Sequence, residues 1–365
     1  MKRILYTQNY FGVGGINKIT SVKANYFVNK GYEVHILCTL AREGVPSEGM
    51  YDDRVITHSI ELERLNSFLR IPLVGRILRF VYSRFMHLKI ILSVNPDIIV
   101  STQQFLEPFS VVLLTFWKKR ILEFHGWYND PQINSVRLQD RLMFRFKFPF
   151  YKIVALTQQE AEKLQRLTGN SVIRIPNPLY SGHETKSNCS NKRVLILARF
   201  SRQKNLLNFL PYWRKVQNSH PDWVLDIYGT GKQEKSISQL VSSHGLTSVH
   251  LHNYTSSPMA ELAASSIYLL PSLFEGFPLV LLESMSVGVP CVCFDCPCGP
   301  SEIIKNGEDG FVVPYLDYDG FIDKVCYLMD RTEEREKMGR KASENIKRFN
   351  IDAIMNQWME LFNSL

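Results

Sequence analysis

Short apolar runs alternate with segments of helical length through the first half of the chain. The strand-like runs are residues 2–7, 33–40, 97–102, 120–124, 153–157 and 172–176. Most are separated by helical-length segments such as residues 159–167, and strands that alternate with helices imply a parallel sheet covered on both faces. We therefore predict a Rossmann-like α/β domain over residues 1–180.

The same alternation restarts after a polar stretch. Residues 181–192 lack periodicity and are the best candidate for a linker. Beyond them the pattern predicts strands at 193–199, 223–229, 249–254 and 267–271, and helices at 206–218, at 234–243 and from Pro258. A second Rossmann-like domain over residues 193–348 follows, and we expect the two domains to face each other across a cleft.

The last segment, residues 349–365, is predicted to be an amphipathic helix. Ile351, Ile354, Trp358 and Leu361 recur at helical spacing.

Length and charge narrow the class of protein. A chain of 365 residues favours two domains of about 150 to 200 residues each. Lys and Arg outnumber Asp and Glu by 43 to 35, which favours an anionic partner such as nucleotide phosphates, a lipid diphosphate or an anionic membrane. No segment reaches the roughly 18 apolar residues of a spanning helix. The apolar run after the basic N-terminal residues is too short for a signal peptide. The cysteines do not form a disulfide framework spread along the chain. We therefore expect a cytoplasmic protein.

Glycines follow the first predicted strand. Gly12, Gly14 and Gly15 precede a helical pattern that begins near Ile16. Glycines at this place let backbone N–H groups approach a phosphate at a helix N-terminus. The spacing is not the dinucleotide fingerprint, so a nicotinamide site is a weak hypothesis. A turn that merely reverses the chain is an equally good interpretation.

A basic apolar helix is predicted between the second and third of these strands. Residues 69–94 carry Arg70, Arg76, Arg79, Arg84 and Lys89 among large apolar residues, with no carboxylate. Such a helix can lie in the headgroup region of an anionic bilayer. The alternative is a helix that covers the sheet and has a solvated basic edge.

His125 and Gly126 come at the end of a predicted strand, where open α/β sheets bind ligands. A lone histidine is more often structural, but this position favours a functional one.

Arg199 and Lys204 lie on the loop that leaves the first strand of the second domain. Two cations there can neutralise a diphosphate, although they could also be solvated surface residues.

Two glutamates flank the start of a predicted helix. Glu275 leaves a strand end, Pro278 suits a first helical turn, and Glu283 lies about two turns beyond Glu275. Carboxylates accept hydrogen bonds from sugar and ribose hydroxyls, and the helix N-terminus between them offers free N–H groups to phosphate or sugar oxygens. A solvated Glu283 is a poor alternative because Val280, Leu281 and Leu282 precede it.

These motifs resemble the family 4 retaining glycosyltransferases, which have the GT-B fold of two Rossmann-like domains. The resemblance rests on ARFSRQKN (198–205), EGFPLVLLE (275–283), GVPCVCFDCPCGPSEII (288–304) and NGEDGFVVP (306–314), with FHG (124–126) and RIPNPL (174–179) in the first half. The segment FDCPCGPSEII is similar to members that build bacterial capsule, O-antigen or lipid-linked oligosaccharides. In this family the last helix crosses back to the N-terminal domain.

The resemblance also implies roles for individual residues. Arg199 and Lys204 would hold the donor diphosphate, Glu283 the ribose hydroxyls and Glu275 the transferred sugar, with His125 beside the reacting sugar. Further donor contacts are implied for Gly14, Gly15, Gly276, Phe277, Leu279 and Val280. Retention would follow from same-face attack, with the leaving phosphate assisting deprotonation of the acceptor.

Two other motifs invite a metal. Cys291, Cys293, Cys296 and Cys298 lack the usual zinc spacing, and Cys291 and Cys293 fall on one face of an apolar strand, so packing is favoured. Asp317-Tyr318-Asp319 is better interpreted as a helix N-cap with a first-turn acid. We expect neither a metal nor another cofactor.

The resulting hypothesis is a retaining hexosyltransferase on the inner face of the membrane. It would move a sugar from a nucleotide-sugar donor, a UDP-hexose or UDP-N-acetylhexosamine, to a polyprenyl-diphosphate-linked saccharide. Its expected partners are the donor, the acceptor and an anionic membrane contacted through residues 69–94, with no nucleic acid. A nucleotide-sugar epimerase of similar fold and a non-catalytic sugar-binding scaffold remain as alternatives.

Overall fold

The computed structural model describes residues 1–9, 11, 14–39, 49–60, 72–102, 109–126, 151–180 and 185–365. They form two compact units. The first unit comprises Met1–Pro176 and Ile354–Leu365, and the second comprises Asn177–Ala353. Residues 177–180 and the described part of the expected linker, 185–192, therefore belong to the second unit. Residues 12, 13, 69–71 and 127–130 of the motifs discussed above lie outside the described residues.

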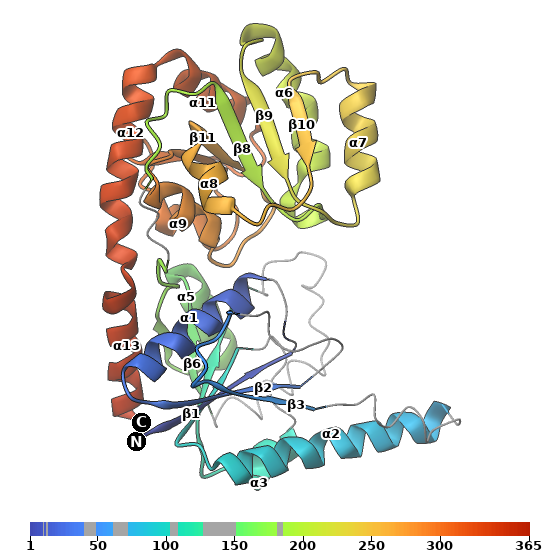
Figure 1. Cartoon of the computed structure of the whole chain (residues 1–365), viewed down its shortest axis with the longest axis vertical. Helices are drawn as coiled ribbons and strands as arrows, with labels where there is room; N and C mark the ends of the chain where they lie inside the picture. Colours follow the sequence, from blue (N-terminus) through green and yellow to red (C-terminus); the bar gives the residue numbers. More distant parts are fainter. Residues whose placement is uncertain are drawn as a thin grey trace. The chain divides into compact units, whose positions relative to one another are not determined.

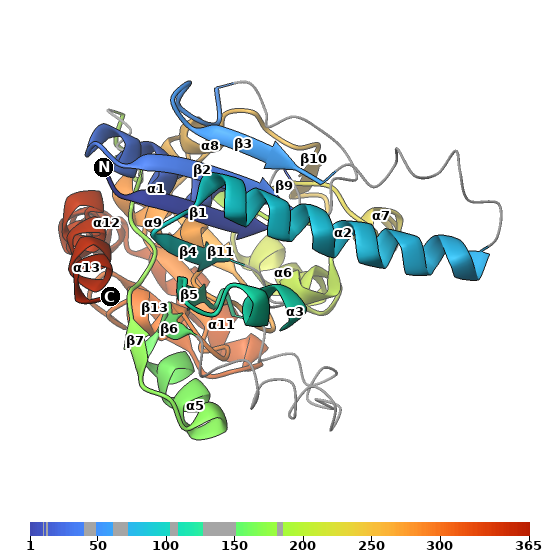
Figure 2. The same cartoon turned by 90° about the horizontal axis from the view of Figure 1, so that it is seen from below.

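A parallel sheet forms the centre of the first unit. Among the described residues it has seven strands in the order β3-β2-β1-β4-β5-β6-β7, an order that can be followed in Figure 2. The strands are β1 (Arg3–Gln8), β2 (Glu33–Cys38), β3 (Ile56–Ser59), β4 (Ile98–Ser101), β5 (Lys119–Glu123), β6 (Lys152–Ala155) and β7 (Val172–Arg174). The edge strand β3 was not predicted, because its four residues are polar or exposed and carry no apolar run.

Helices accompany this sheet at the expected places in the chain. They are α1 (Gly15–Asn29), α2 (Pro72–Val94), α3 (Phe109–Leu114), α5 (Gln158–Thr168) and α13 (Ile351–Ser364). Local chemistry fixes the ends of α5, since the Thr157 side chain accepts a hydrogen bond from the Glu160 N–H and Gly169 takes the left-handed conformation.

The terminal helix α13 packs on the first unit, as predicted (Figure 1). The Phe362 ring lies 5.0 Å from the Phe27 ring of α1, and the Lys23 ammonium lies 4.3 Å from the Trp358 ring. Of the apolar positions predicted from helical spacing, Ile354, Trp358 and Leu361 are buried and Ile351 is half-buried, while Met355 and Phe362 are buried as well.

The second unit is built on the same plan. Among the described residues its sheet has six parallel strands in the order β10-β9-β8-β11-β12-β13. They are β8 (Arg193–Leu197), β9 (Val224–Tyr228), β10 (Val249–His252), β11 (Ile267–Leu270), β12 (Cys291–Phe294) and β13 (Gly310–Val313). The helices are η4 (Arg202–Lys204), α6 (Leu206–Ser219), α7 (Glu234–Ser243), α8 (Pro258–Ala263), α9 (Leu279–Ser286), α10 (Pro300–Ile303), α11 (Tyr318–Asp330), α12 (Thr332–Asn345) and η5 (Ile346–Phe349).

Two sequence interpretations concern this unit directly. The Asp317 side chain accepts a hydrogen bond from the Gly320 N–H at 2.9 Å, which confirms it as the N-cap of α11. Cys291 and Cys293 are buried on β12, and each thiol lies against a backbone carbonyl, of Val289 and Phe311 respectively. Burial raises the pKa of the Cys291 thiol to about 12, so these side chains act in packing as neutral thiols.

None of the helices in the described part of the chain is both long and apolar enough to traverse a bilayer.

Candidate active site

The order of strands in the second sheet brings two loops together. β8 and β11 are hydrogen-bonded neighbours, while β9 and β10 lie on one side of them and β12 and β13 on the other. The strand order therefore reverses between β8 and β11, and ligands of open parallel sheets bind at such a point, beyond the carboxyl ends of the strands. The loop after β8 carries Arg199 and Lys204, and the loop after β11 carries Glu275.

Lys204 and Glu275 form an ion pair at this point. The Lys204 Nζ lies 2.6 Å from Glu275 Oε1, and the side chains are only 14% and 8% exposed. Water screens such a pair less than it screens a surface pair. Lys204 and Glu275, two residues expected to bind the donor, thus come from different loops and contact each other.

Backbone and amide groups clamp the two loops. The Gln203 carbonyl accepts a hydrogen bond from the Leu273 N–H at 2.8 Å, and the Gln203 side chain donates to the Phe274 carbonyl at 2.9 Å. Asn205 takes a left-handed conformation and donates to the Pro271 carbonyl at 3.0 Å. Sequence reasoning missed both amides. The sequence feature that could have indicated them is their position directly before and after Lys204 in the motif ARFSRQKN.

Arg199 follows β8 and is exposed, so its charge is available to a ligand. A turn that contains glycine follows β9 and packs against the backbone of Phe200, the residue after Arg199. The Phe200 N–H donates to the Thr230 carbonyl at 2.8 Å. A Cβ on Gly231, whose φ is 156°, would lie 2.4 Å from the Phe200 carbonyl oxygen, so only glycine fits here.

The turn before α9 differs slightly from expectation. The helix begins at Leu279, so Pro278 is the N-cap residue and does not lie in the first turn. Leu279 and Val280 are half-buried, and their N–H groups have no acceptor within the helix. Phe277 is buried, with its ring 5.4 Å from the Phe349 ring.

Gly299 packs closely on this turn. Its φ is 123°, and an added Cβ would lie 2.8 Å from the Gly276 carbonyl oxygen and 2.9 Å from Pro278 Cδ. The segment Gly299–Glu302 (Gly-Pro-Ser-Glu) therefore packs against the Glu275–Pro278 turn. The spacing of these residues along the chain did not predict this contact.

Glu283 is buried on α9, so the alternative of a solvated helix residue is wrong. Its carboxylate accepts a hydrogen bond from the Tyr180 hydroxyl. Burial, with the neighbouring Glu283 charge, raises the pKa of Tyr180 and keeps the hydroxyl a donor. Sequence reasoning missed Tyr180, although it comes directly after the quoted RIPNPL segment.

The remaining predicted residues lie in the first unit. His125 follows β5, its side chain is largely buried, and its Nε2 lies 3.5 Å from Glu123 Oε1. The Lys23 ammonium also binds this carboxylate oxygen, and both side chains are fully buried. Although burial alone raises the pKa of Glu123, Lys23 and His125 hold it down at about 2. The His125 imidazole therefore lies against a carboxylate that stays negatively charged at neutral pH.

Gly14 is the N-cap residue of α1, and Gly15 is the first residue of that helix. The Gly14 φ of 171° is extended backbone, and an added Cβ would meet nothing within 4 Å. Neither backbone conformation nor packing within the described structure demands glycine at position 14.

Known proteins share sequence with the second unit and the fold with the whole chain. Residues 183–345, most of the second unit, match the family model described as Glycosyl transferases group 1. An exopolysaccharide phosphotransferase of Streptomyces coelicolor is 35% identical over 218 residues, which cover 58% of this chain and 23% of that protein. A UDP-Gal:alpha-D-GlcNAc-diphosphoundecaprenol alpha-1,3-galactosyltransferase of Escherichia coli is 34% identical over 108 residues, 26% of this chain and 28% of that protein.

The chain spans less than two thirds of the length of the curated relatives that it matches first. Its fold, in contrast, matches a solved structure from end to end. A TarM mutant of S. aureus, in complex with Fondaparinux, alpha-GlcNAc-glycerol and UDP, has a TM-score of 0.79 at 13% identity and covers 100% of both chains. At that identity the likeness shows the fold alone, and it confirms the predicted GT-B fold. Residues 183–345 are therefore similar to the glycosyl transferases group 1 family, within a chain that has the GT-B fold.

Proposed function

We propose that this protein is a retaining glycosyltransferase that uses a UDP-sugar, a UDP-hexose or UDP-N-acetylhexosamine. The observation that carries the proposal is the Lys204–Glu275 pair at the strand-order reversal of a group 1 domain, with Glu283 buried on the helix that follows. A cation, a carboxylate and a helix N-terminus gathered at a sheet's ligand-binding edge suit a diphosphate joined to a sugar. Relatives of the fold with UDP bound support the choice of nucleotide.

In the proposed reaction the bond between the sugar C1 and the donor phosphate oxygen breaks. A new bond forms between C1 and an acceptor hydroxyl oxygen on the same face of the sugar. The hydroxyl proton passes to the departing diphosphate, so UDP is the second product. Arg199 and Lys204 stabilise the charge that develops on the leaving group, and Glu283 accepts the ribose hydroxyls. In this proposal Glu275 contacts the sugar, and His125 acts on the sugar that is transferred. The two cations supply this charge without a catalytic metal.

The open start of α1 fits this role. Gly14 is required neither by its backbone angles nor by its neighbours in the described structure. The absence of a side chain there leaves room for the donor phosphates or the acceptor to approach the backbone of Gly14 and Gly15.

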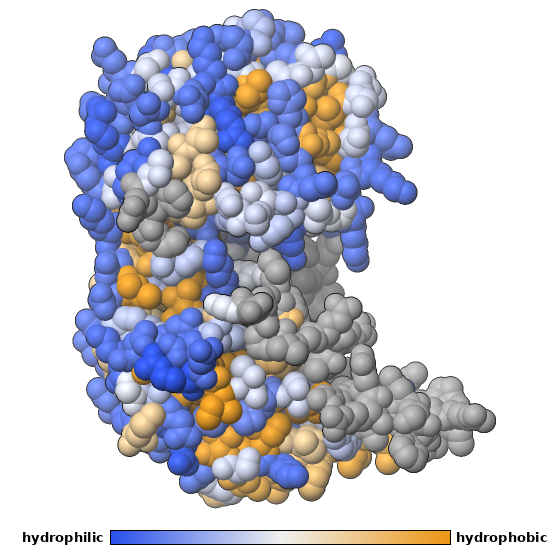
Figure 3. Space-filling view, viewed as in Figure 1, coloured by the Kyte–Doolittle hydropathy of each residue, from blue (hydrophilic) through white to orange (hydrophobic). Residues whose placement is uncertain are grey.

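We further propose that the acceptor is a polyprenyl-diphosphate-linked saccharide in surface polysaccharide synthesis, reached from the inner face of the membrane. The Escherichia coli relative named for a diphosphoundecaprenol substrate supports this acceptor class. An exposed apolar surface on the first unit supports the membrane. Figure 3 shows hydrophobic residues gathered over α2 and α3. The residues of this apolar surface are Leu78, Phe80, Val81, Phe85, Leu92, Leu113, Leu114, Phe116 and Trp117.

Basic side chains border this apolar surface. Arg79, Lys89 and Lys119 are exposed, and the Arg84 guanidinium stacks on the Phe80 ring at 3.1 Å. Apolar side chains with basic neighbours suit insertion into an anionic headgroup region. Phe116 and Trp117, which follow α3, extend the predicted membrane contact beyond residues 69–94.

Product analysis tests the sugar transfer. The purified chain is incubated with UDP-glucose, UDP-galactose or UDP-N-acetylglucosamine and an undecaprenyl-diphosphate-linked saccharide, and mass spectrometry follows both products. We expect one sugar residue added and UDP released. Release of UMP with a sugar phosphate added would indicate the phosphotransferase class of the Streptomyces relative. A new free UDP-sugar without acceptor would indicate an epimerase, and donor binding without turnover a scaffold.

Vesicle flotation tests the membrane contact. The charge-reversal variant Arg79→Glu/Lys89→Glu should bind vesicles of anionic phosphatidylglycerol more weakly at low salt, and Phe116→Ser/Trp117→Ser should weaken binding at any salt. The matched control is Lys163→Glu/Arg166→Glu on α5. Binding that is unchanged in both test variants would refute the proposed surface.

A further inference from the structure

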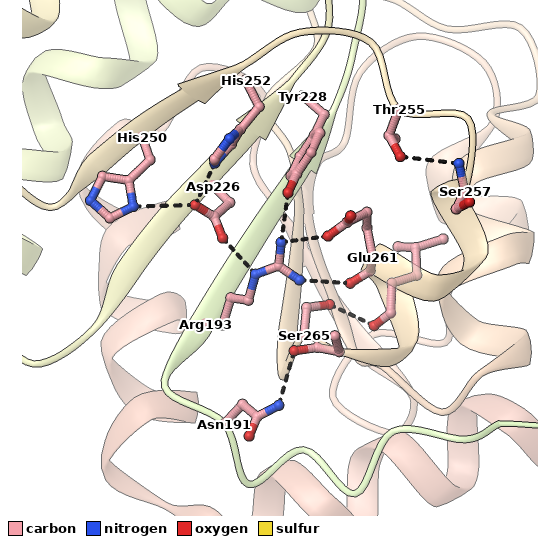
Figure 4. Close-up of polar contacts among 12 residues, drawn as sticks. Asn191, Arg193, Asp226, Tyr228, His250, His252, Thr255, Ser257, Glu261 and Ser265 are labelled. Carbon is pink, nitrogen blue, oxygen red and sulfur yellow. Dashed lines mark hydrogen bonds and ion pairs between the residues drawn. The ribbon is translucent and has the colours of Figure 1, made fainter.

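Three side chains able to bind a metal converge at the edge of the second sheet (Figure 4). Asp226 lies on β9, and His250 and His252 lie two residues apart on the edge strand β10, so both imidazoles project from the same face. The parallel register places His250 beside Asp226. The ligand atoms of the three residues all lie within 4.8 Å of one another.

The distances are close to those of a coordinated ion. His252 Nε2 lies 2.8 Å, and His250 Nδ1 3.3 Å, from the same oxygen, Asp226 Oδ1. Ligand atoms of a tetrahedral zinc with bonds of about 2.0–2.1 Å lie about 3.3 Å apart. The imidazoles are 50% and 37% exposed, so an ion can reach them from solvent.

The carboxylate is held in place by the residues behind it. Asp226 Oδ2 accepts a hydrogen bond from Arg193 Nε at 2.5 Å, and Arg193 in turn binds Glu261 Oε2 at 2.7 Å (Figure 4). Glu261 thereby offsets the guanidinium charge, and Oδ1 stays directed toward the imidazoles. The Tyr228 ring stacks on the His252 ring at 4.3 Å. Supporting contacts of this kind orient metal ligands and tune their affinity.

We propose that Asp226, His250 and His252 bind one divalent transition-metal ion, Zn²⁺ in the first place, with water completing its coordination. Two imidazoles and one carboxylate form a ligand set for zinc and its neighbours and not for Mg²⁺ or Ca²⁺, which take oxygen ligands. The ion joins the edge strand β10 to β9. Its ligands lie on strands, apart from the loops that carry Lys204 and Glu275, and it takes no part in the proposed sugar transfer.

Metal analysis of the full chain without an affinity tag tests this site. After treatment with a chelator, the protein is dialysed against ZnCl₂ and its metal content and melting temperature are measured. We expect one Zn²⁺ per chain and a rise in melting temperature. His250→Gln and His252→Gln should each weaken binding by more than the roughly 10- to 100-fold that loss of a supporting residue costs. The control is His220→Gln, since His220 faces a single carboxylate, Asp330, at 2.9 Å.

Two results would overturn the proposal. One is wild-type protein that takes up no Zn²⁺, which would leave the cluster as an ordinary set of histidine–aspartate contacts. The other is equal uptake by wild type and both histidine variants, which would assign the ion to other groups. Substitution with Co²⁺ separates the cases further, because thiolate ligands give intense charge-transfer absorption that a site of nitrogen and oxygen ligands lacks.

Discussion

Lys23 and Glu123 form an ion pair inside the first unit, with side chains that are 1% and 0% exposed. The Trp358 ring covers the ammonium, and the His125 imidazole lies against the carboxylate. Taking two charges out of water is costly, and a buried charge without its partner is costlier still. Through this pair, His125 is connected to Lys23 on α1 and to Trp358 on α13.

Removing one partner should destabilise the first unit. We expect Lys23→Met to lower its free energy of unfolding by about 3–5 kcal/mol, and the double variant Lys23→Met/Glu123→Gln to lower it less. Urea unfolding followed by tryptophan fluorescence measures both. Lys30→Met, at the end of the same helix, is the control. A single variant as stable as wild type would show that the pair is not formed.

The same carboxylate predicts a loss of stability in acid. The pKa of Glu123 is about 2 in the folded protein and near 4.3 when unfolded, so its charge stabilises the fold fully above pH of about 4.3. This contribution is lost as the pH falls through about 2, because the unfolded state binds the proton first. Between these values Glu123→Gln should show a flatter fall of melting temperature with pH than wild type. Parallel profiles would contradict this.

Lys204→Ala and Glu275→Ala should each reduce sugar transfer by at least about 100-fold in kcat, because each removes a charge aimed at the donor. The double variant should lose less than the product of the two, since the residues contact each other. Lys215→Ala breaks the exposed pair with Asp319 in the same unit and should leave kcat unchanged. Circular dichroism checks folding. Near-normal turnover in either single variant would remove these residues from the site.

Tyr180→Phe should weaken donor binding more than it slows the reaction. Loss of the hydroxyl removes the hydrogen bond to the Glu283 carboxylate, an interaction worth about 1.5 kcal/mol or roughly tenfold in affinity. Calorimetric titration with UDP and a comparison of KM with kcat measure the effect. An unchanged KM with a reduced kcat would place Tyr180 at the reacting sugar instead of at the nucleotide.

The sequence predicted most of the fold because the strands are buried parallel strands. Runs such as Ile4–Tyr6 and Ile267–Leu270 are apolar throughout, as strands covered on both faces must be. The strand Ile56–Ser59 escaped prediction because an exposed edge strand needs no apolar run. Pro278 was placed in the helix because proline suits both the cap and the first turn.

The candidate site was predicted as a set of residues and not as an arrangement. Lys204 and Glu275 lie 71 residues apart, and only the pairing of β8 with β11 brings their loops together. The Tyr180 contact with Glu283 and the Asp226–His250–His252 cluster depend likewise on long-range pairing. Spacing along the chain predicts which side chains share one helix or strand. It carries no information on which strands are neighbours.

The passage of the chain between the units has a practical consequence. The chain leaves the first unit after Pro176 and returns at Ile354, so the second unit is an insertion within the first. The ends of the chain also meet on the first unit, where Lys2 Nζ lies 2.9 Å from Asn363 Oδ1. A circularly permuted protein that begins at Asn177, joins Leu365 to Met1 and stops at Pro176 would make both units continuous. Cutting such a protein once, after residue 353, would release each unit whole.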